Sequence, residues 1–391
     1  MMDLSRLPRI TFWRAVLALI LATGFYSTIL RFTKGLGAAT ALSDKFPWGV
    51  WISFDVLCGV GLAAGGFTLA AVVYIFHLER FHPIVRPTIL TAFLGYGLVG
   101  VALLFDLGRP YRIWHPLVMW NPRSVMFEVA WCVMLYLTVL ALEFSPAVFE
   151  RFRLQRPLRI LKAITIPLVI VGVLLSTLHQ SSLGSLYLIV PSKLHPYWYS
   201  PWLPVFFFIS AIGVGLAMVI FESNLSARAF GREIEMPLLT ELSRVMLVVL
   251  AFYGLLRFQD LASRGALRLM REPSTETLLL GLEVLLGLIV PLTMLLFWAV
   301  RESREGLFAV AVMVITGFLL NRLNVSITGL EASSGAHYFP KWTEISVTLS
   351  LAGAGFLCFA LAVRYLNVFE SHTPPAGLEC PSEPDRTPVE V

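Results

Sequence analysis

Long apolar stretches alternate with short polar connections along the whole chain. Ten of these stretches are long enough to cross a bilayer, because about 20 residues at a helical rise of about 1.5 Å span a hydrocarbon core of about 30 Å. Their approximate limits are 12–31, 49–77, 88–106, 124–144, 160–179, 202–222, 243–261, 277–300, 306–321 and 344–366. The pattern predicts an all-α polytopic membrane protein with about ten transmembrane helices.

The apolar pattern also divides the chain into three parts. We expect an N-terminus over 1–11, a transmembrane helical domain over 12–368 and a disordered tail over 369–391, where prolines are frequent. Within the domain we expect two four-helix bundles plus flanking helices, although the residues show no clear internal repeat. The first stretch could be a cleaved signal peptide, but its length and the basic residues after it favour a retained anchor.

Composition and charge support this interpretation. Charged residues make up 14% of the chain and hydrophobic residues 57%, whereas a soluble domain carries about 25% charged residues. The net charge is +5, but the basic residues form no continuous stripe, so we expect no nucleic-acid partner. One basic cluster lies between the fourth and fifth stretches, and the positive-inside rule then places it and both termini in the cytoplasm. It comprises Arg151, Arg153, Arg156, Arg159 and Lys162.

The metal-ligating residues argue against several cofactors. The four cysteines lie far apart with no CxxC pair, so the sequence predicts neither an iron–sulphur cluster nor another metal site. A membrane b-type haem needs two histidines at matched depth on facing helices. Of seven histidines, His77 and His82 lie at the inner edge, and only His179 lies at the outer end of an apolar stretch, so no pair at matched depth exists. We therefore expect no haem on this chain.

Three connections on the predicted outer side are long and rich in Trp, Tyr, His, Asn and Pro. They cover 106–124, 179–202 and 321–344. An interfacial aromatic belt accounts for the Trp and Tyr residues, but not for the polar runs beside them. These connections predict a docking surface for a partner outside the membrane.

Ionisable residues inside the apolar stretches gather near the same side. A charge at the bilayer centre costs about 2.5–3.5 kcal/mol, so each one needs a reason. Six of them lie within about 10 Å of the outer boundary at the helical rise, and Tyr96 lies about 15 Å deep. The six are Asp55, Asp106, Glu128, Arg257, Asp260 and Glu283.

An ordinary explanation exists for some of these residues, because charges near the interface snorkel or pair, as Arg257 and Asp260 could one turn apart. Glu128 fits it least, since its sequence neighbours are apolar all round and it needs a cavity to reach water. The inner half offers charges at helix ends, among them Glu143 and Glu222, which read as interfacial.

Carboxylates, Tyr96 and His179 under an aromatic rim could bind an amphiphilic ring that enters from the lipid. Quinone reduction consumes two electrons and two protons. A partner outside the membrane could supply the electrons and buried carboxylates the protons. The same composition is compatible with a secondary transporter, although transporters usually place their sites at the midplane. It is also compatible with a passive anchor for a redox partner.

Several motifs resemble one known family. They are FPWGVWISFDVLCGVGLAAGGF (46–67), LGYGLVG (94–100), VMFEVAWC (125–132), ALEFSPAVFER (141–151), LHQSSLGSL (178–186), VIFES (219–223), LRFQDLASR (256–264) and YFPKWTEI (338–345). Together they resemble the NrfD/polysulphide-reductase membrane subunits, nearest to the HybB-type branch that serves NiFe hydrogenase-2. The likeness covers most of 46–370.

The resemblance implies a ten-helix subunit without a cofactor of its own, in the bacterial inner membrane, that exchanges electrons with menaquinone as its substrate. The implied partners are a periplasmic ferredoxin-like iron–sulphur subunit, the large and small hydrogenase subunits, and the quinone pool. Hydrogen chemistry would lie on those partners. Related subunits serve polysulphide, nitrite or sulphite-linked complexes, which is the alternative.

The resemblance also implies site residues. The quinone-site carboxylate of the family falls on Glu128, its tyrosine on Tyr96 and its histidine on His179. The inner glutamate linked to proton movement falls on Glu222. Asp55 and Asp106 lie in matching motifs as further quinone-binding candidates.

Overall fold

The computed structural model describes residues 11–369, which fold almost entirely into helices. Within this range ten helical segments are long and apolar enough to span a membrane, which confirms the predicted all-α polytopic fold. The predicted N-terminus 1–11 and tail 369–391 lie, apart from residues 11 and 369, outside the described residues. Their predicted locations and the disorder of the tail therefore stay predictions.

Six spans are single long helices. These are α1 (Phe12–Lys34), α6 (Val125–Arg151), α7 (Gln155–Leu188), α8 (Leu203–Phe230), α9 (Met236–Ser263) and α15 (Trp342–Tyr365).

Each of the other four spans consists of consecutive helical segments. The second span comprises η2 (Trp51–Cys58), α3 (Gly59–Leu62), α4 (Gly65–Ala70) and η3 (Ala71–Ile75), and the third comprises η4 (Glu79–Phe81) and α5 (His82–Asp106). The eighth span comprises α10 (Thr275–Val284), η9 (Leu285–Ile289) and α11 (Val290–Leu296), and the ninth comprises α13 (Arg304–Leu323), η10 (Asn324–Thr328) and α14 (Gly329–Ser334).

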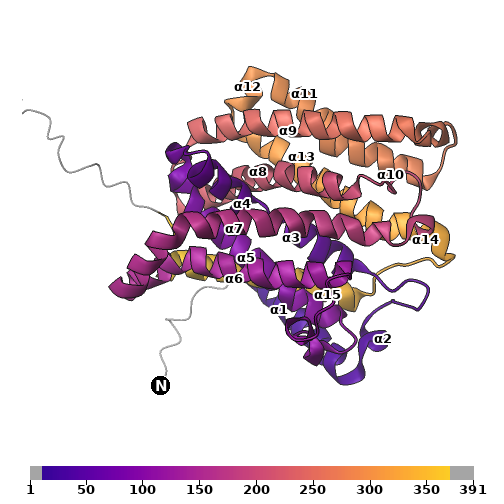
Figure 1. Cartoon of the computed structure of the whole chain (residues 1–391), viewed down its shortest axis with the longest axis horizontal. Helices are drawn as coiled ribbons and strands as arrows, with labels where there is room; N and C mark the ends of the chain where they lie inside the picture. The colour runs from indigo at the N-terminus through magenta and orange to yellow at the C-terminus, as the bar shows by residue number, and fades with distance from the viewer. Residues whose placement is uncertain (1–10, 370–391) are drawn as a thin grey trace, which may run out of the picture.

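The spans pack as two four-helix bundles with one flanking pair, as predicted (Figure 1). The first bundle holds the segment from η2 to η3 with α5, α6 and α7. The second bundle holds α8 and α9 with the segments α10–α11 and α13–α14. The flanking pair, α1 and α15, pack on each other, and α15 also packs on α5. The termini of the described chain thus close one side of the first bundle.

The two ends of the molecule differ in character. One end, called the aromatic end, carries the connections 107–124, 189–202 and 335–341; it lies at the right of Figure 1, near the labels α2 and α14. The opposite end, called the basic end, carries the α6–α7 turn near Arg151 and Arg153.

Glycine pairs bring helices into close contact at two places. A Cβ added to Gly215 on α8 would lie 2.8 Å from the amide nitrogen of Gly65 on α4, so the two bundles touch there through bare backbone. Gly317 on α13 and Gly287 on η9 meet in the same way inside the second bundle. These contacts fix how the bundles and the helices around their polar sites are spaced.

Candidate functional site

Four buried polar side chains form a cluster in the first bundle, here called the hydroxyl cluster. Tyr96 comes from α5, Tyr136 from α6, and Ser176 and His179 from α7, and none is more than 1% exposed. The ring of Tyr96 lies 4.7 Å from that of Tyr136 and 5.7 Å from the imidazole of His179. The structure therefore brings together two predicted site residues, Tyr96 and His179, and adds two that the sequence did not single out.

The polar atoms of the hydroxyl cluster are unusual because they lack partners. Ser176 lies close to the hydroxyls of both tyrosines, yet none of the five atoms makes a hydrogen bond of acceptable geometry. Buried polar groups are nearly always hydrogen-bonded, and those that are not call for a specific explanation. One such explanation is an exchangeable hydrogen-bond partner, such as water or a substrate oxygen. The five atoms are Tyr96 Oη, Tyr136 Oη, Ser176 Oγ, His179 Nδ1 and His179 Nε2.

The position of His179 corrects the prediction that it lies at the outer end of a helix. Helix α7 continues to Leu188, so His179 is nine residues inside it. The continuation is polar, but its polar residues face the bundle interior: Gln180 and Ser182 are both buried, and Gln180 Nε2 donates to the carbonyl of Val60 at 3.2 Å. A hydropathy average therefore ends this helix too early.

Glu128 corrects a second expectation. It lies in the first turn of α6 and its side chain is exposed at the surface of the chain, not enclosed. A carboxylate in a first helical turn is favoured by the helix dipole. Cys132, one turn further on, lies near both Glu128 and Tyr96. Glu128 thus lies on the same face of α6 as Tyr136, two turns nearer the start of the helix.

The connection 107–124 folds beside Glu128. Trp131 Nε1 donates to the carbonyl of Pro116 at 2.8 Å, and the ring of Trp131 lies 4.8 Å from that of Trp120. Trp120 is 65% exposed, so this connection offers an aromatic surface next to the carboxylate.

A cavity of about 480 Å³ lies on the other side of α5, between that helix, the segment from η2 to η3, α8 and α15. Its walls are almost wholly apolar. Asp55 lines it in the half near the aromatic end, and Glu222 lines it in the half near the basic end. Asp55 accepts a hydrogen bond from Thr348 Oγ1 at 2.8 Å, and Thr91 lies near Glu222. Two further predicted site residues therefore share one ligand-sized cavity.

The local helix geometry explains how Asp55 reaches this cavity. The turn from Trp51 to Cys58 is a π-helix, a rare wide form that is frequent at functional sites. Small residues on the facing helices, such as Gly95 on α5 and Ala352 on α15, leave the space open.

Asp106 belongs to neither site. It ends α5 beside Arg31, whose guanidinium donates to the carbonyls of Phe105 and Leu107 at 2.6 and 2.7 Å. Glu344 lies near as well, and it accepts bonds from Tyr338 Oη at 2.6 Å and from the Ala41 amide at 2.8 Å. These contacts join the flanking pair to the first bundle, so Asp106 lies with residues that hold helices together.

The second bundle contains a polar network around Glu283. Its carboxylate accepts hydrogen bonds from Trp198 Nε1 at 2.9 Å, Asn321 Nδ2 at 2.8 Å and Asn324 Nδ2 at 2.9 Å. Arg322 donates to Asn321 Oδ1 at 2.6 Å and lies between two phenylalanine rings. Sequence reasoning noted Glu283 but missed Arg322, because a lone arginine near a helix end looks like an interfacial charge.

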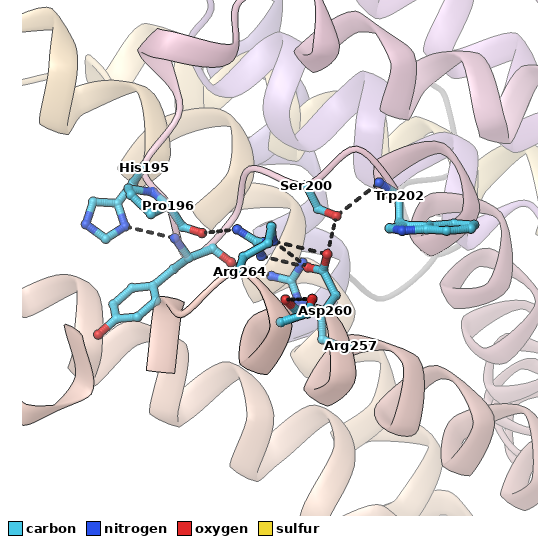
Figure 2. A network of polar contacts seen from close by, with 9 residues as sticks. His195, Pro196, Ser200, Trp202, Arg257, Asp260 and Arg264 are labelled. Carbon is cyan, nitrogen blue, oxygen red and sulfur yellow. Dashed lines mark hydrogen bonds and ion pairs between the residues drawn. The ribbon is translucent and has the colours of Figure 1, made fainter. Parts of the chain in front are cut away.

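Figure 2 shows how α9 holds the connection 189–202 at the aromatic end. Asp260 pairs with Arg264 at 2.6 Å and accepts a bond from Ser200 Oγ at 2.8 Å. Arg264 also donates to the carbonyl of Pro196 at 2.7 Å. The suggested pairing of Arg257 with Asp260 is replaced, because Arg257 donates to the carbonyl of Tyr197 at 2.9 Å instead.

Glu143 was also undervalued by the sequence. It lies between α6 and α7, where its Oε1 would be 3.4 Å from a Cβ added to Gly172, and it interacts with Tyr136. The sequence contains a signal for this position, since Gly172 on α7 is a small residue that leaves room for the side chain of Glu143.

Comparisons with known proteins agree on one family. A family profile described as "Polysulphide reductase, NrfD" matches residues 38–332. A protein of Nitratidesulfovibrio vulgaris Hildenborough, whose name states no function, is 41% identical over 91% of this chain and 94% of its own length. The probable Ni/Fe-hydrogenase 2 b-type cytochrome subunit of Escherichia coli K12 is 35% identical over 87% of this chain and 88% of that protein. The integral membrane subunit of menaquinone reductase from N. vulgaris Hildenborough is 26% identical over 93% of each chain.

Proposed function

Because the chain belongs to the NrfD polysulphide-reductase family, we propose that it is the quinone-reactive membrane subunit of a hydrogenase complex. An iron–sulphur partner bound at the aromatic end passes two electrons to menaquinone, and this chain binds the quinone and supplies two protons. Its 35% identity to a hydrogenase 2 subunit supports the hydrogenase branch. Its likeness to a menaquinone reductase subunit supports the quinone.

The large cavity carries this proposal. Ligand sites are typically clefts of about 300–1,000 Å³ with apolar walls and a few placed polar groups, and a cavity of about 480 Å³ with Asp55 and Glu222 in its walls fits that description. The isoprenoid tail suits the apolar walls, and the ring lies at the Asp55–Thr348 end, nearest the electron donor. Glu222 marks the end toward the cytoplasm.

The hydroxyl cluster handles protons in this proposal. Tyr96 and His179 lie across α5 from the cavity, with atoms that can accept or donate a proton and have no fixed partner. Glu128 connects the cluster to the surface at the aromatic end through Cys132. Both protons and both electrons then end on the quinol, and no group on this chain changes its oxidation state.

The orientation and the cofactor content are part of the proposal. The aromatic end faces the periplasm and the basic end the cytoplasm, in a bacterial inner membrane. We propose that the chain holds no haem, although its E. coli relative is named a b-type cytochrome subunit. An oxidised-minus-reduced optical spectrum of the purified chain without b-type bands is the expected result.

The experiment compares three carboxylate variants in the purified complex: Asp55→Asn, Glu128→Gln and, as a control, Glu241→Gln, whose carboxylate pairs with Arg80 at the basic end. General acid–base groups contribute about 10²–10⁴-fold. We therefore expect hydrogen-dependent quinone reduction to fall at least about a hundredfold in the first two. The control should keep its turnover.

The two site variants also separate binding from proton supply. Asp55→Asn should weaken binding of a quinone analogue, whereas Glu128→Gln should leave binding intact and slow turnover only. Normal turnover in both variants would overturn the proposed site. Failure of the wild-type complex to bind the analogue would favour a passive anchor, and uptake of a solute by the chain alone in proteoliposomes would favour a transporter.

The partner assignment is tested by affinity purification of the tagged chain in mild detergent. Recovery of a ferredoxin-like subunit and the hydrogenase pair is expected. Recovery of a different reductase would contradict the hydrogenase branch and retain the quinone site.

A further inference from the structure

A second cavity, here called the chamber, lies inside the second bundle. It measures about 50 Å³ and lies between α8, α9, α10–α11 and α13. Polar side chains make up a larger share of its walls than of the walls of the large cavity, although apolar residues predominate in both. The polar residues of the chamber wall are Ser210, Tyr253, Arg257, Glu283 and Asn321.

One charged donor in the chamber wall has no partner. Arg257 is 5% exposed, and although its Nη2 donates to the Tyr197 carbonyl, its Nε makes no hydrogen bond. An unpaired buried donor on a charged group is costly, so an acceptor should fill this position. The chamber can hold one or two water molecules, since a water takes about 30 Å³ in the liquid.

The backbone around the chamber is irregular in two places. The π-helical turns η9 and η10 begin two residues after Glu283 and two residues after Arg322, on the two helices that supply the wall carboxylate and amide. Such turns widen a helix and are frequent at functional sites. One of them, η9, contributes Gly287 and Leu288 to the chamber wall, which indicates that the space is a feature of the fold.

A polar ladder leads from the chamber to the aromatic end. Arg257, Asp260 and Arg264 follow one another on α9 at spacings of three and four, so they share one helix face. Figure 2 shows them beneath the connection 189–202. The side chain of Arg264 is 20% exposed, so the ladder runs from a buried donor to the surface over about 10 Å at the helical rise.

We propose that the chamber is a water-binding site that joins Arg257 to Glu283 and exchanges its water, and the protons that water carries, with the aqueous phase at the aromatic end. The ligand is water, because the carboxylate of Glu283 in the wall repels an anion and a volume of about 50 Å³ is too small for a lipid chain. The site concerns the second bundle and holds whether or not the quinone assignment does.

Radiolytic footprinting of the purified complex in lipid nanodiscs tests this. Hydroxyl radicals form from water, so a side chain covered by protein and lipid is oxidised only where water lies beside it. We expect oxidation at Tyr253, which lines the chamber, and none at Phe144, which packs in an apolar core. After rapid mixing with water enriched in the heavy oxygen isotope, the oxygen added to Tyr253 should carry that isotope within milliseconds.

A matched pair of variants tests the location. Val314→Ile adds one methylene group at an apolar residue that lines the chamber, so it should reduce the oxidation of Tyr253 severalfold. Val312→Ile makes the same change on an exposed face of the same helix and should leave it unchanged.

Two results would overturn the proposal. Tyr253 that stays as unreactive as Phe144 in the folded wild-type complex would show a dry chamber. Oxidation that retains the light isotope for minutes would show trapped water and exclude exchange with the aromatic end.

Discussion

In the first bundle, five polar atoms of Tyr96, Tyr136, Ser176 and His179 are buried without a hydrogen-bond partner, and a large apolar cavity lies across α5. In the second bundle, the carboxylate of Glu283 accepts three hydrogen bonds, and it lies in the wall of a small cavity lined by both polar and apolar residues. The polar residues of the two bundles thus differ: a bonded network joins the helices of the second bundle, whereas the hydroxyl cluster of the first bundle has no fixed hydrogen-bond partners, and we propose that it serves the chemistry of the site.

The largest effect should come from removing the centre of the bonded network. Glu283→Leu leaves the donors of Trp198, Asn321 and Asn324 without an acceptor, and each unsatisfied donor costs about 1–3 kcal/mol. We expect a loss of about 3 kcal/mol in stability and a clear drop in the unfolding midpoint, measured by thermal unfolding in detergent. Glu283→Gln keeps one acceptor oxygen and should lose less. Equal unfolding midpoints for Glu283→Leu and the wild type would show that the network does not stabilise the second bundle and would remove the contrast with the first.

The next largest effect should come from filling the large cavity beside the first bundle. Ala352→Trp places a ring in the cavity wall opposite α5, so it should compete with the quinone. We expect the KM for a soluble quinone analogue to rise about tenfold, equivalent to about 1.4 kcal/mol of binding. Leu357→Trp adds bulk to an exposed position of the same helix and is the control. An unchanged KM in the Ala352 variant would separate the cavity from quinone binding.

A smaller effect distinguishes unpartnered hydroxyls from partnered ones. Tyr136→Phe removes a buried hydroxyl that has no hydrogen bond, so stability should stay within about 0.5 kcal/mol or rise. Asn321→Leu removes an amide bonded to both Glu283 and Arg322 and should destabilise clearly. The two variants are compared by their unfolding midpoints. A loss of more than about 1 kcal/mol in the tyrosine variant would mean that a tightly held water satisfies the hydroxyl.

The sequence predicted the number of spans well, because each contributes a long apolar average that needs no knowledge of neighbours. It placed helix ends poorly where polar residues face the interior, as in α7 beyond His179. It predicted Glu128 as enclosed, because sequence neighbours do not reveal that a first helical turn at the bundle surface leaves a side chain exposed.

The grouping of site residues could not be read from the sequence at all. Tyr96 and Gly95 are adjacent along α5, yet Tyr96 faces the hydroxyl cluster and Gly95 the large cavity. Asp55 and Thr348 are bonded although 293 residues apart. Cavities arise from small residues on several helices at once, and only the packed bundle shows where these coincide.

The smallest effect concerns the connection that joins the two bundles, 189–202, and it depends on pH. His195 in this connection lies outside the spans, and burial lowers its pKa from the ordinary value of 6.5, with nearby Glu276 partly opposing the shift. The unfolded form therefore binds a proton at higher pH than the folded form, so the stability of the connection falls as pH drops through that value. Protonation also removes Nδ1 as the acceptor of the Tyr197 amide.

Hydrogen–deuterium exchange of residues 189–202 measures this. We expect protection to decrease between about pH 7.5 and about pH 5.5, after correction for the intrinsic exchange rate. His195→Gln should flatten that dependence, whereas His337→Gln, at an exposed imidazole 2.7 Å from Glu331, should not change it. If the dependence persists in the His195 variant, another group controls the connection. If it vanishes, one imidazole sets how firmly the connection holds the first bundle to the second.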